Sequence, residues 1–251
     1  MVRRHDHDAG GPGELLEAKR ALREEVWTAL RGARVARFPG AHGRIPNFVG
    51  AEAAARLLRA TDEWARARTL KCNPDSPQLP VRRAALEDGK RVAMAVPRLA
   101  DRLPFHLLDP RVLSGSLREA ASIRGASRAG VAVDVPAIGV VDMVVTGCVA
   151  VDAGGARLGK GGGFSDLELA VAAEAGLVTE HTVVVTTVHE LQIRNEGEIP
   201  VADHDIRLDL IVTPERVIRC ERARPSRPRV RWDELTEEKI AAIPLLGRLR
   251  R

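Results

Sequence analysis

Three short runs of Val, Ile and Leu constrain the fold of this chain more than any other feature. They lie at residues 140–146, 181–188 and 208–212, and each is nearly continuous in apolar character. Strands with this pattern are covered on both faces. Helical patterns separate them, and strands that alternate with helices favour an α/β fold with a parallel sheet and right-handed crossovers.

Length and composition set the size of the folded unit. The chain has 251 residues, of which 45% are hydrophobic, which is enough for a core. We expect one α/β domain over residues 14–220. A disordered tail, 1–13, precedes it, and a basic extension rich in Pro and Arg, 221–251, follows it. The tail lacks the apolar segment of a secretion signal, and no apolar run approaches the ~18 residues of a membrane span.

The charge balance bears on possible partners. The net charge is +5, but the basic residues are scattered and rarely alternate with aromatic residues. This pattern disfavours a nucleic-acid partner and fits an anionic small-molecule substrate. Cys72, Cys148 and Cys220 lie far apart and form no C-x-x-C motif, which is typical of reduced thiols in a cytoplasmic protein.

Residues 152–166 are the strongest candidate for a functional site. This stretch contains six glycines together with Arg157, Lys160 and a final Asp166. Glycine permits positive φ, so consecutive amides can turn toward an anion. A helix predicted over 167–175 would add its N-terminal amides and dipole. Arg157 and Lys160 add positive charge, and Asp166 can hold Mg²⁺ against phosphate oxygens, so the stretch predicts a polyphosphate-binding loop.

A simpler interpretation of the same stretch is a hairpin or a flexible loop, since glycine runs after strands are often no more than that. Residues 154–160 share the G-x-x-x-x-G-K spacing of a P-loop, but Gly161 replaces the Ser or Thr that a P-loop needs for its metal. The G-x-G-x-x-G motif is absent from the sequence. Phosphate binding here would therefore belong to another fold.

Two further pairs of residues carry open alternatives. Lys19 and Arg23 lie four residues apart on a helix predicted over 14–31, and they form either a solvated basic stripe or two cations that reach a phosphate. His189 and Glu190 are either a general acid–base pair or polar groups at a strand end. The remaining pattern predicts helices at 51–60, 81–88, 117–121 and 235–243 and strands at 64–71 and 91–96.

Three segments of the chain resemble the 5-formyltetrahydrofolate cyclo-ligases. Residues 19–23 (KRALR) resemble the family's K-x-x-L-R helix, and residues 155–166 (GARLGKGGGFSD) are similar to its G-x-R-L-G-x-G-x-G-Y-Y-D signature. Residues 199–205 (IPVADHD), with Asp209 and Val212, resemble its closing strand region. Residues 44–48, 188–190 and 243–244 look like the branch called methenyltetrahydrofolate synthetase domain-containing proteins.

The resemblance implies a fold, a reaction and a set of residue roles. The fold would be a three-layer Rossmann-like α/β structure related to ribose-phosphate isomerases and CoA transferases. ATP and Mg²⁺ would phosphorylate the formyl oxygen of 5-formyltetrahydrofolate, and ring closure would give 5,10-methenyltetrahydrofolate. The implied catalytic residues are Arg157 and Lys160, and the implied metal ligands are Asp166 and Asp205. The implied nucleotide-binding residues are Lys19, Arg23, Gly159, Lys160, Gly161, Gly162, Gly163 and Phe164.

Two departures from the family pattern fall in the folate half of the site. The pair of tyrosines before the aspartate is Phe164 and Ser165 here, and the segment 73–78 carries no glutamate where the family places a folate-binding one. The phosphate half is the better preserved. An alternative is therefore a paralogue that keeps the phosphate site and acts on another substrate, for example in thiamine metabolism.

Overall fold

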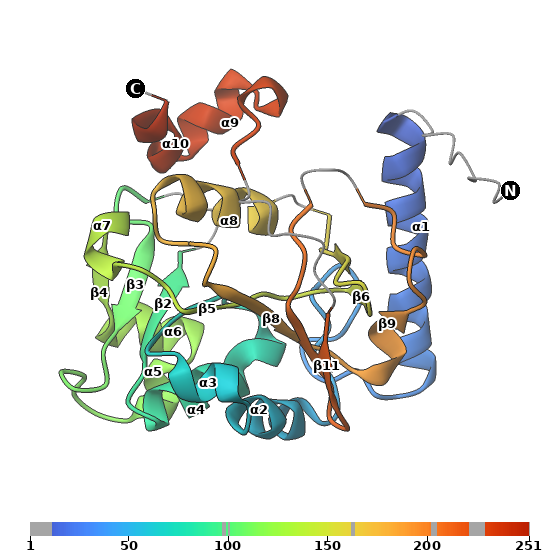
Figure 1. Ribbon diagram of the computed structural model, residues 1–251, viewed down its shortest axis with the longest axis horizontal. Coiled ribbons are helices and arrows are strands. Elements are labelled where there is room, and N and C mark those ends of the chain that lie inside the picture. The colour runs from blue at the N-terminus through green and yellow to red at the C-terminus, as the bar shows by residue number, and fades with distance from the viewer. Residues whose placement is uncertain are drawn as a thin grey trace, which may run out of the picture.

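A large mixed sheet forms the centre of the molecule (Figure 1). The computed structural model describes residues 12–96, 99, 101–161, 164–201, 205–220 and 229–250, without the side chains of 12, 164–166 and 234. Within these residues the large sheet has the strand order β11-β10-β8-β5-β1-β2-β3-β4. Its strands are β1 (Thr69–Cys72), β2 (Arg91–Ala95), β3 (Phe105–Leu108), β4 (Val131–Val133), β5 (Met143–Val145), β8 (Val183–Thr187), β10 (Leu210–Val212) and β11 (Val217–Arg219).

The five central strands of this sheet run parallel. β10 pairs with β8, β8 with β5, β5 with β1, and β1 with β2, all in parallel register. Among the flanking strands, β11 pairs antiparallel with β10, β3 with β2, and β4 with β3. The chain segments that follow Cys72, Val145 and Thr187 therefore meet at one edge of the sheet, which is where ligands gather in such folds.

Helices cover both faces of the large sheet, as Figure 1 shows. One face packs against α8 (Phe164–Glu174), and the other packs against α2 (Ala51–Arg59) and α4 (Leu79–Glu87). The shorter helices are α3 (Asp62–Arg66), α5 (Leu117–Ala120), α6 (Ile123–Ala129) and α7 (Val135–Ile138). The predicted α/β fold with a sheet between helical layers is confirmed.

A second, smaller sheet supports the long N-terminal helix. It contains β7 (Arg157–Leu158), β6 (Ala150–Asp152) and β9 (Ile193–Arg194), and β9 follows the 3-10 turn η3 (Glu190–Gln192). α1 (Pro12–Gly32) buries Val26, Trp27 and Leu30 in an apolar cluster with residues of β6 and β7. This cluster fixes the orientation of α1 beside the glycine-rich stretch.

The C-terminal helices pack over α8 (Figure 1). After the turn η4 (Trp232–Glu234), α9 (Glu237–Ala242) and α10 (Pro244–Leu249) place Ile240, Ile243, Leu245 and Leu246 in the same apolar cluster as α8. The sequence separates residues 221–251 from the main domain, yet the described part of that segment shares the domain's core. Because arginine and proline dominate the composition of this segment, its apolar positions are difficult to recognise in the sequence.

Most of the predicted helices and buried strands are confirmed. The helix expected over 14–31 is α1, those over 51–60 and 81–88 are α2 and α4, and the strand over 181–188 contains β8. Two boundaries are wrong. α8 begins at Phe164, not 167. The strand over 140–146 is limited to β5, because Val140 is exposed and the Asp142 carboxylate accepts hydrogen bonds from Arg68 N and Thr69 N.

The strand predicted over 64–71, with one solvated face, is also wrong. Its first part is helix α3, because Thr61 caps the Trp64 amide and the Trp64 indole donates to Asp88. Its last part joins β1, whose four residues are all buried. The alternation of Ala and Arg that suggested a strand crosses the end of a short helix.

Candidate functional site

The glycine-rich stretch 152–166 divides into two structures with different roles. Residues 152–158 form a β6–β7 hairpin, in which Gly155 has φ +83° and Asp152 Oδ1 accepts a hydrogen bond from Ala156 N at 2.9 Å. The hairpin interpretation is therefore correct for Gly154 and Gly155. The second part, which starts at Gly159, leads into the N-terminus of α8, where a loop can offer amides to an anion.

Arg23 of α1 lies along this second part of the loop. Its Nε donates to the carbonyl oxygen of Gly159 at 2.7 Å. Gly161 has φ +100°, and a Cβ there would lie 3.4 Å from Arg23 Cζ. Partial burial lowers the pKa of Arg23. The structure thus brings together three residues that the sequence assigned to one site.

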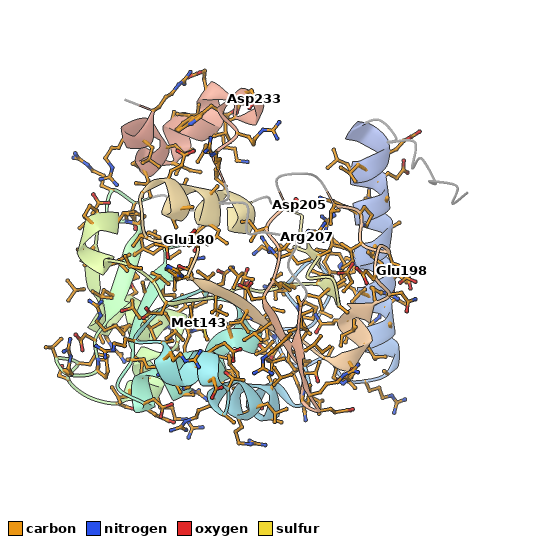
Figure 2. All side chains as sticks on the ribbon, viewed as in Figure 1. Met143, Glu180, Glu198, Asp205, Arg207 and Asp233 are labelled. Atoms are coloured by element: carbon orange, nitrogen blue, oxygen red, sulfur yellow. The ribbon has the colours of Figure 1, made fainter. Side chains whose placement is uncertain are left out.

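Lys19 lies one turn before Arg23 and contacts a different segment. Its ammonium is 2.6 Å from Asp205 Oδ2, and both side chains are largely buried. Figure 2 shows Asp205 between α8 and α1. The sequence assigned Lys19 to phosphate and Asp205 to metal. The two are paired with each other, and their assigned roles at the site stay predictions. The interpretation of this helix face as a solvated stripe is wrong.

Lys160 of the glycine loop lies near Asp75, which follows the carboxyl end of β1. Burial raises the pKa of Asp75, and the positive charge of Lys160 is the largest influence opposing that rise. A Cβ at Gly147, which follows β5, would lie 2.9 Å from Asp75 Oδ2 and 2.8 Å from Ile45 Cγ2. Asp75 therefore lies between the glycine loop and the end of β5, and Gly147 leaves room for its carboxylate.

A buried arginine holds the backbone around Asp75. Arg82 of α4 donates to the carbonyl oxygens of Asn73, at 2.6 Å, and Asp75, at 3.1 Å, while its Nε donates to Ala121 O. Burial lowers the pKa of Arg82 to about 10, which still leaves it charged at neutral pH. The loop after β1 is therefore rigid and presents the Asp75 carboxylate at a fixed place.

A buried ion pair lies beneath the first turns of α8. Lys71 Nζ of β1 is 2.5 Å from Glu168 Oε1 of α8, with the two side chains 3% and 10% exposed. Lys71 also donates to Asn73 Oδ1 at 2.9 Å. A fixed charge pair thus joins β1, its following loop and the helix that the glycine loop enters.

The remaining predicted residues are placed less completely. Arg157 lies on β7 and is buried, so its predicted catalytic role stays a prediction. Gly162 and Gly163, and the side chains of Phe164 and Asp166, lie outside the described residues. Among the side chains that are described, no group of three or more His, Cys, Asp or Glu residues is arranged to hold a metal ion.

His189 and Glu190 have structural roles in this fold. His189 Nδ1 accepts a hydrogen bond from Leu191 N and caps η3, and burial lowers the pKa of its imidazole. Glu190 forms an ion pair with Arg216 at 2.7 Å. These partners support the interpretation of the pair as polar groups at a strand end.

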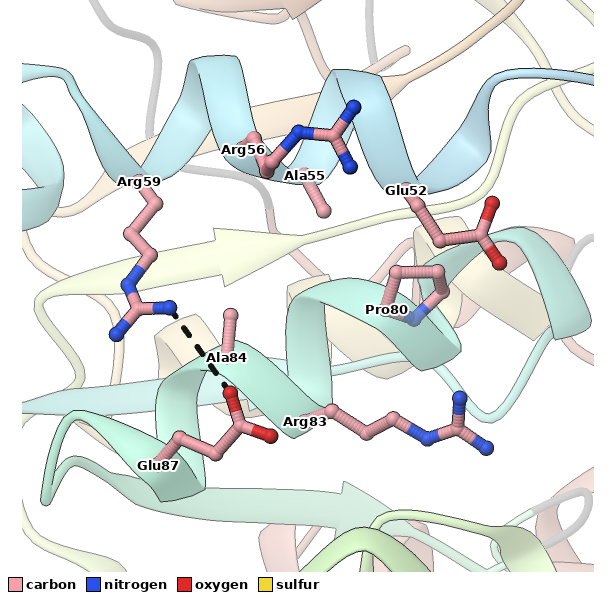
Figure 3. A pocket seen from close by; sticks show the side chains of 8 residues that line it. All are labelled: Glu52, Ala55, Arg56, Arg59, Pro80, Arg83, Ala84 and Glu87. Atoms are coloured by element: carbon pink, nitrogen blue, oxygen red, sulfur yellow. Dashed lines mark ion pairs between the residues drawn. The ribbon is translucent and has the colours of Figure 1, made fainter.

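A groove on the outer surface between α2 and α4 offers a second concentration of arginines (Figure 3). It has a volume of about 190 Å³ and is lined by Glu52, Ala55, Arg56, Arg59, Pro80, Arg83, Ala84 and Glu87. Arg59 pairs with Asp88 and Glu87. None of the residues predicted from the sequence lines this groove, which is therefore separate from the predicted site.

Several residues near the predicted site could not be recognised from the sequence. Asp75, Arg82, Lys71 and Glu168 carry no motif, and Lys71 and Glu168 belong to elements far apart in the chain. One signal was present: Lys71 is a charged residue between apolar neighbours in a strand. A charge that is buried in a core requires a partner, so such a position is worth examining as a site.

The chain matches the model of the 5-formyltetrahydrofolate cyclo-ligase family over residues 13–214. It belongs to that family. The match contains α1, the glycine loop, α8 and Asp205, which are the parts that converge in the structure. The resemblance found in the sequence is therefore confirmed.

Curated relatives place the chain near one branch of the family. It is 39% identical to a methenyltetrahydrofolate synthase domain-containing protein of Mus musculus over 93% of this chain, and 36% identical to that of Homo sapiens. It covers only 63% and 61% of those two proteins. A 5-formyltetrahydrofolate cyclo-ligase of Mycolicibacterium smegmatis is 38% identical over 32% of this chain.

A solved structure supports the fold. The 5,10-methenyltetrahydrofolate synthetase of Aquifex aeolicus, determined by NMR, aligns with a TM-score of 0.52 at 18% identity, over 88% of this chain and 99% of that one. In the part of the chain that the structure describes, no helix is both long enough and apolar enough to cross a membrane.

Proposed function

We propose that this chain uses ATP and Mg²⁺ to convert 5-formyltetrahydrofolate to 5,10-methenyltetrahydrofolate. The observation that carries the proposal is the contact of Arg23 with the loop at Gly159 and Gly161, immediately before the N-terminus of α8. Positive side chains and helix amides directed at one loop provide the charge stabilisation that phosphoryl transfer requires. Family membership supports the reaction class.

The reaction needs two displacements. The formyl oxygen attacks the γ-phosphorus of ATP, and ADP leaves with the electrons of the broken P–O bond. The neighbouring folate nitrogen, N10, then attacks the activated formyl carbon, phosphate leaves with the C–O bonding pair, and N10 loses its proton. In this scheme Lys19, Arg23 and Lys160 neutralise the phosphate oxygens, and the loop amides orient them.

The metal would lie against Asp205 and Asp166. Carboxylate oxygens are the protein ligands that Mg²⁺ prefers, and the ion often takes only one or two of them, with phosphate and water completing its shell. Lys19 holds the Asp205 carboxylate in place through their ion pair. A bound Mg²⁺ supplies charge neutralisation of the phosphates.

In this proposal, Asp75 is the acidic group of the folate half of the site. The segment 73–78 carries no glutamate, but Asp75 presents its carboxylate beside Lys160 and Gly147 at the sheet edge. A carboxylate in this place can accept hydrogen bonds from the N–H groups of a heterocycle. This observation favours a reduced folate as the second substrate.

The direct test is formation of the methenyl product. Purified protein at a concentration equal to that of 5-formyltetrahydrofolate, with ATP and Mg²⁺, should generate the absorbance of 5,10-methenyltetrahydrofolate. Omission of ATP or of Mg²⁺ should abolish the signal. No product under stoichiometric conditions would overturn the proposal.

A second candidate is a paralogue that binds nucleotide and acts on another substrate, such as a thiamine-related one. Phe164 and Ser165 in place of two tyrosines favour it. A thermal-shift panel of nucleotides and thiamine phosphates separates the two, because a ligand stabilises the native state it binds. A shift with ATP and a thiamine phosphate, without methenyl formation, would support this candidate.

A further inference from the structure

The ion pair between Lys71 and Glu168 occupies a layer that is otherwise apolar. In the sheet register, Lys71 lies beside Ala93 of β2 and Val144 of β5, both fully buried in the cluster that packs against α8. Glu168 projects from α8 between apolar residues of the same cluster. Nothing in the packing of this layer requires a charge.

A buried ion pair is a poor source of stability. The free energy needed to desolvate two charges can exceed the free energy gained from their attraction. Apolar residues of similar volume often stabilise a core as well or better. The pair nevertheless joins two elements that the candidate site must hold in register, which are β1 and the helix behind the glycine loop. Its place suggests a role in positioning.

The pair also continues into the site. Lys71 donates to Asn73 Oδ1, and the Asn73 side chain is hydrogen bonded to Asp75. Asp75 in turn lies close enough to Lys160 to be influenced by its charge. A series of contacts therefore runs from Glu168 of α8 through Lys71 and Asn73 to Asp75, which lies within range of the charge on Lys160.

We propose that Lys71 is a positioning residue. Through Glu168 it fixes the first turns of α8, and through Asn73 it fixes Asp75, so that the glycine loop and Lys160 keep the geometry that binds a nucleotide triphosphate. This inference rests on the proposed function of the loop. Lys71 itself is buried and does not touch the ligand.

Paired substitutions separate positioning from stability. Lys71→Met and Glu168→Leu each leave one buried charge without its partner and should lower Tm, whereas the double variant removes both charges and should recover most of that loss. The affinity for Mg-ATP, measured by calorimetry, should fall by about tenfold or more in the double variant, the size typical of residues that orient a binding group through another residue.

Two more variants make the test specific. Asn73→Ala cuts the path to Asp75 while the ion pair remains, and it should weaken Mg-ATP binding by a similar factor even if the double variant does not fold. Lys90 is a matched control: it is buried before β2, at the opposite edge of the sheet, and donates to Trp64 O and Ala67 O. Lys90→Met should lower Tm without changing the affinity for Mg-ATP.

The outcomes distinguish this inference from the proposed function. If the unmodified protein binds Mg-ATP and the folded double variant or Asn73→Ala binds it equally well, Lys71 has only a structural role and the inference is overturned. If the unmodified protein does not bind Mg-ATP, the proposed function fails first and the inference fails with it. Loss of affinity in a double variant of recovered Tm supports the inference.

Discussion

At the scale of single residues, Asp75 is a position where the candidate site lowers the stability of the folded state. Burial raises the pKa of its carboxyl, while Lys160, Arg82 and Lys71 act in the opposite direction without cancelling that rise. An ionised Asp75 at neutral pH is therefore a net cost to the folded state. Such a cost is typical of functional positions.

Asp75→Asn should raise the stability of the protein at pH 7. A carboxyl whose pKa is raised on folding stabilises the native state in its protonated form, and that contribution is lost as the pH rises through the folded pKa. The advantage of the variant should therefore shrink as the pH falls toward about 3.9, the ordinary value for aspartate. Urea midpoints of both proteins across this range measure it. Lower stability of the variant at pH 7 would show that the cations outweigh burial.

Lys160→Ala should weaken Mg-ATP binding and leave the fold intact. A charge-assisted hydrogen bond contributes about 1.5–3 kcal/mol, so the expected loss of affinity is about tenfold to hundredfold. Arg111→Ala, at an exposed ion pair after β3, is the control and should bind normally. Calorimetric titration gives both values. Unchanged affinity in Lys160→Ala would remove this residue from the site.

The sequence predicts part of this site at the residue scale. The location of Lys19 and Arg23 on one helix is confirmed, because a spacing of four residues on a helix is a local property, while their roles at the site stay predictions. Lys71 and Glu168 could not be paired, since only the register of β1 in the sheet and the docking of α8 bring them together. Local patterns carry no information about such distant pairs.

At the scale of elements, the two described glycines of the loop between β7 and α8, Gly159 and Gly161, differ in conformation. Gly161 has φ +100° and lies against the Arg23 guanidinium, whereas Gly159 has no positive φ and open space around its Cα. A side chain would therefore destabilise the loop more at Gly161 than at Gly159, although both glycines belong to the same motif.

Gly161→Ala should destabilise the loop and weaken Mg-ATP binding. A left-handed conformation costs an L-residue about 1–2 kcal/mol, and the added Cβ would lie in van der Waals contact with the Arg23 side chain. Gly159→Ala is the matched control and should change stability little. Tm and calorimetric affinity of the two variants give the comparison. Equal behaviour of the two would contradict the described loop conformation.

Elements were predicted well where they are long and less well where they are short. α1 and α4 have enough residues to show helical spacing. β6, β7 and β9 have two or three residues each, and β6 and β7 lie between β5 and the loop that starts at Gly159. Periodicity cannot reveal a strand of two residues, because its stability comes from its neighbours in the sheet.

At the scale of the whole molecule, the C-terminal helices are part of the folded unit. Leu246 of α10 is fully buried in the cluster that contains α8, and Val230 N donates to Glu174 Oε1 of α8 at 2.8 Å. The helix that follows the glycine loop is thus packed on both sides, by the sheet and by the C-terminal segment. Stability of the site and of the C-terminus should be linked.

Leu246→Ala should destabilise the entire domain. Removing a fully buried leucine side chain typically costs about 2–5 kcal/mol. Thermal unfolding should remain a single transition at a lower Tm, because the cluster is shared. Leu16→Ala on the exposed face of α1 is the control and should change stability by less than about 0.5 kcal/mol. An unchanged Tm for Leu246→Ala would mean that the segment is independent of the domain.

The position of a bound nucleotide tests the central claim most directly. A crystal grown with a non-hydrolysable ATP analogue and Mg²⁺ should show the phosphates over residues 159–161, within hydrogen-bonding distance of Lys160 and the loop amides, with the metal against Asp205. Phosphates bound in the groove of Arg56 and Arg83, between α2 and α4, with the glycine loop empty, would contradict it.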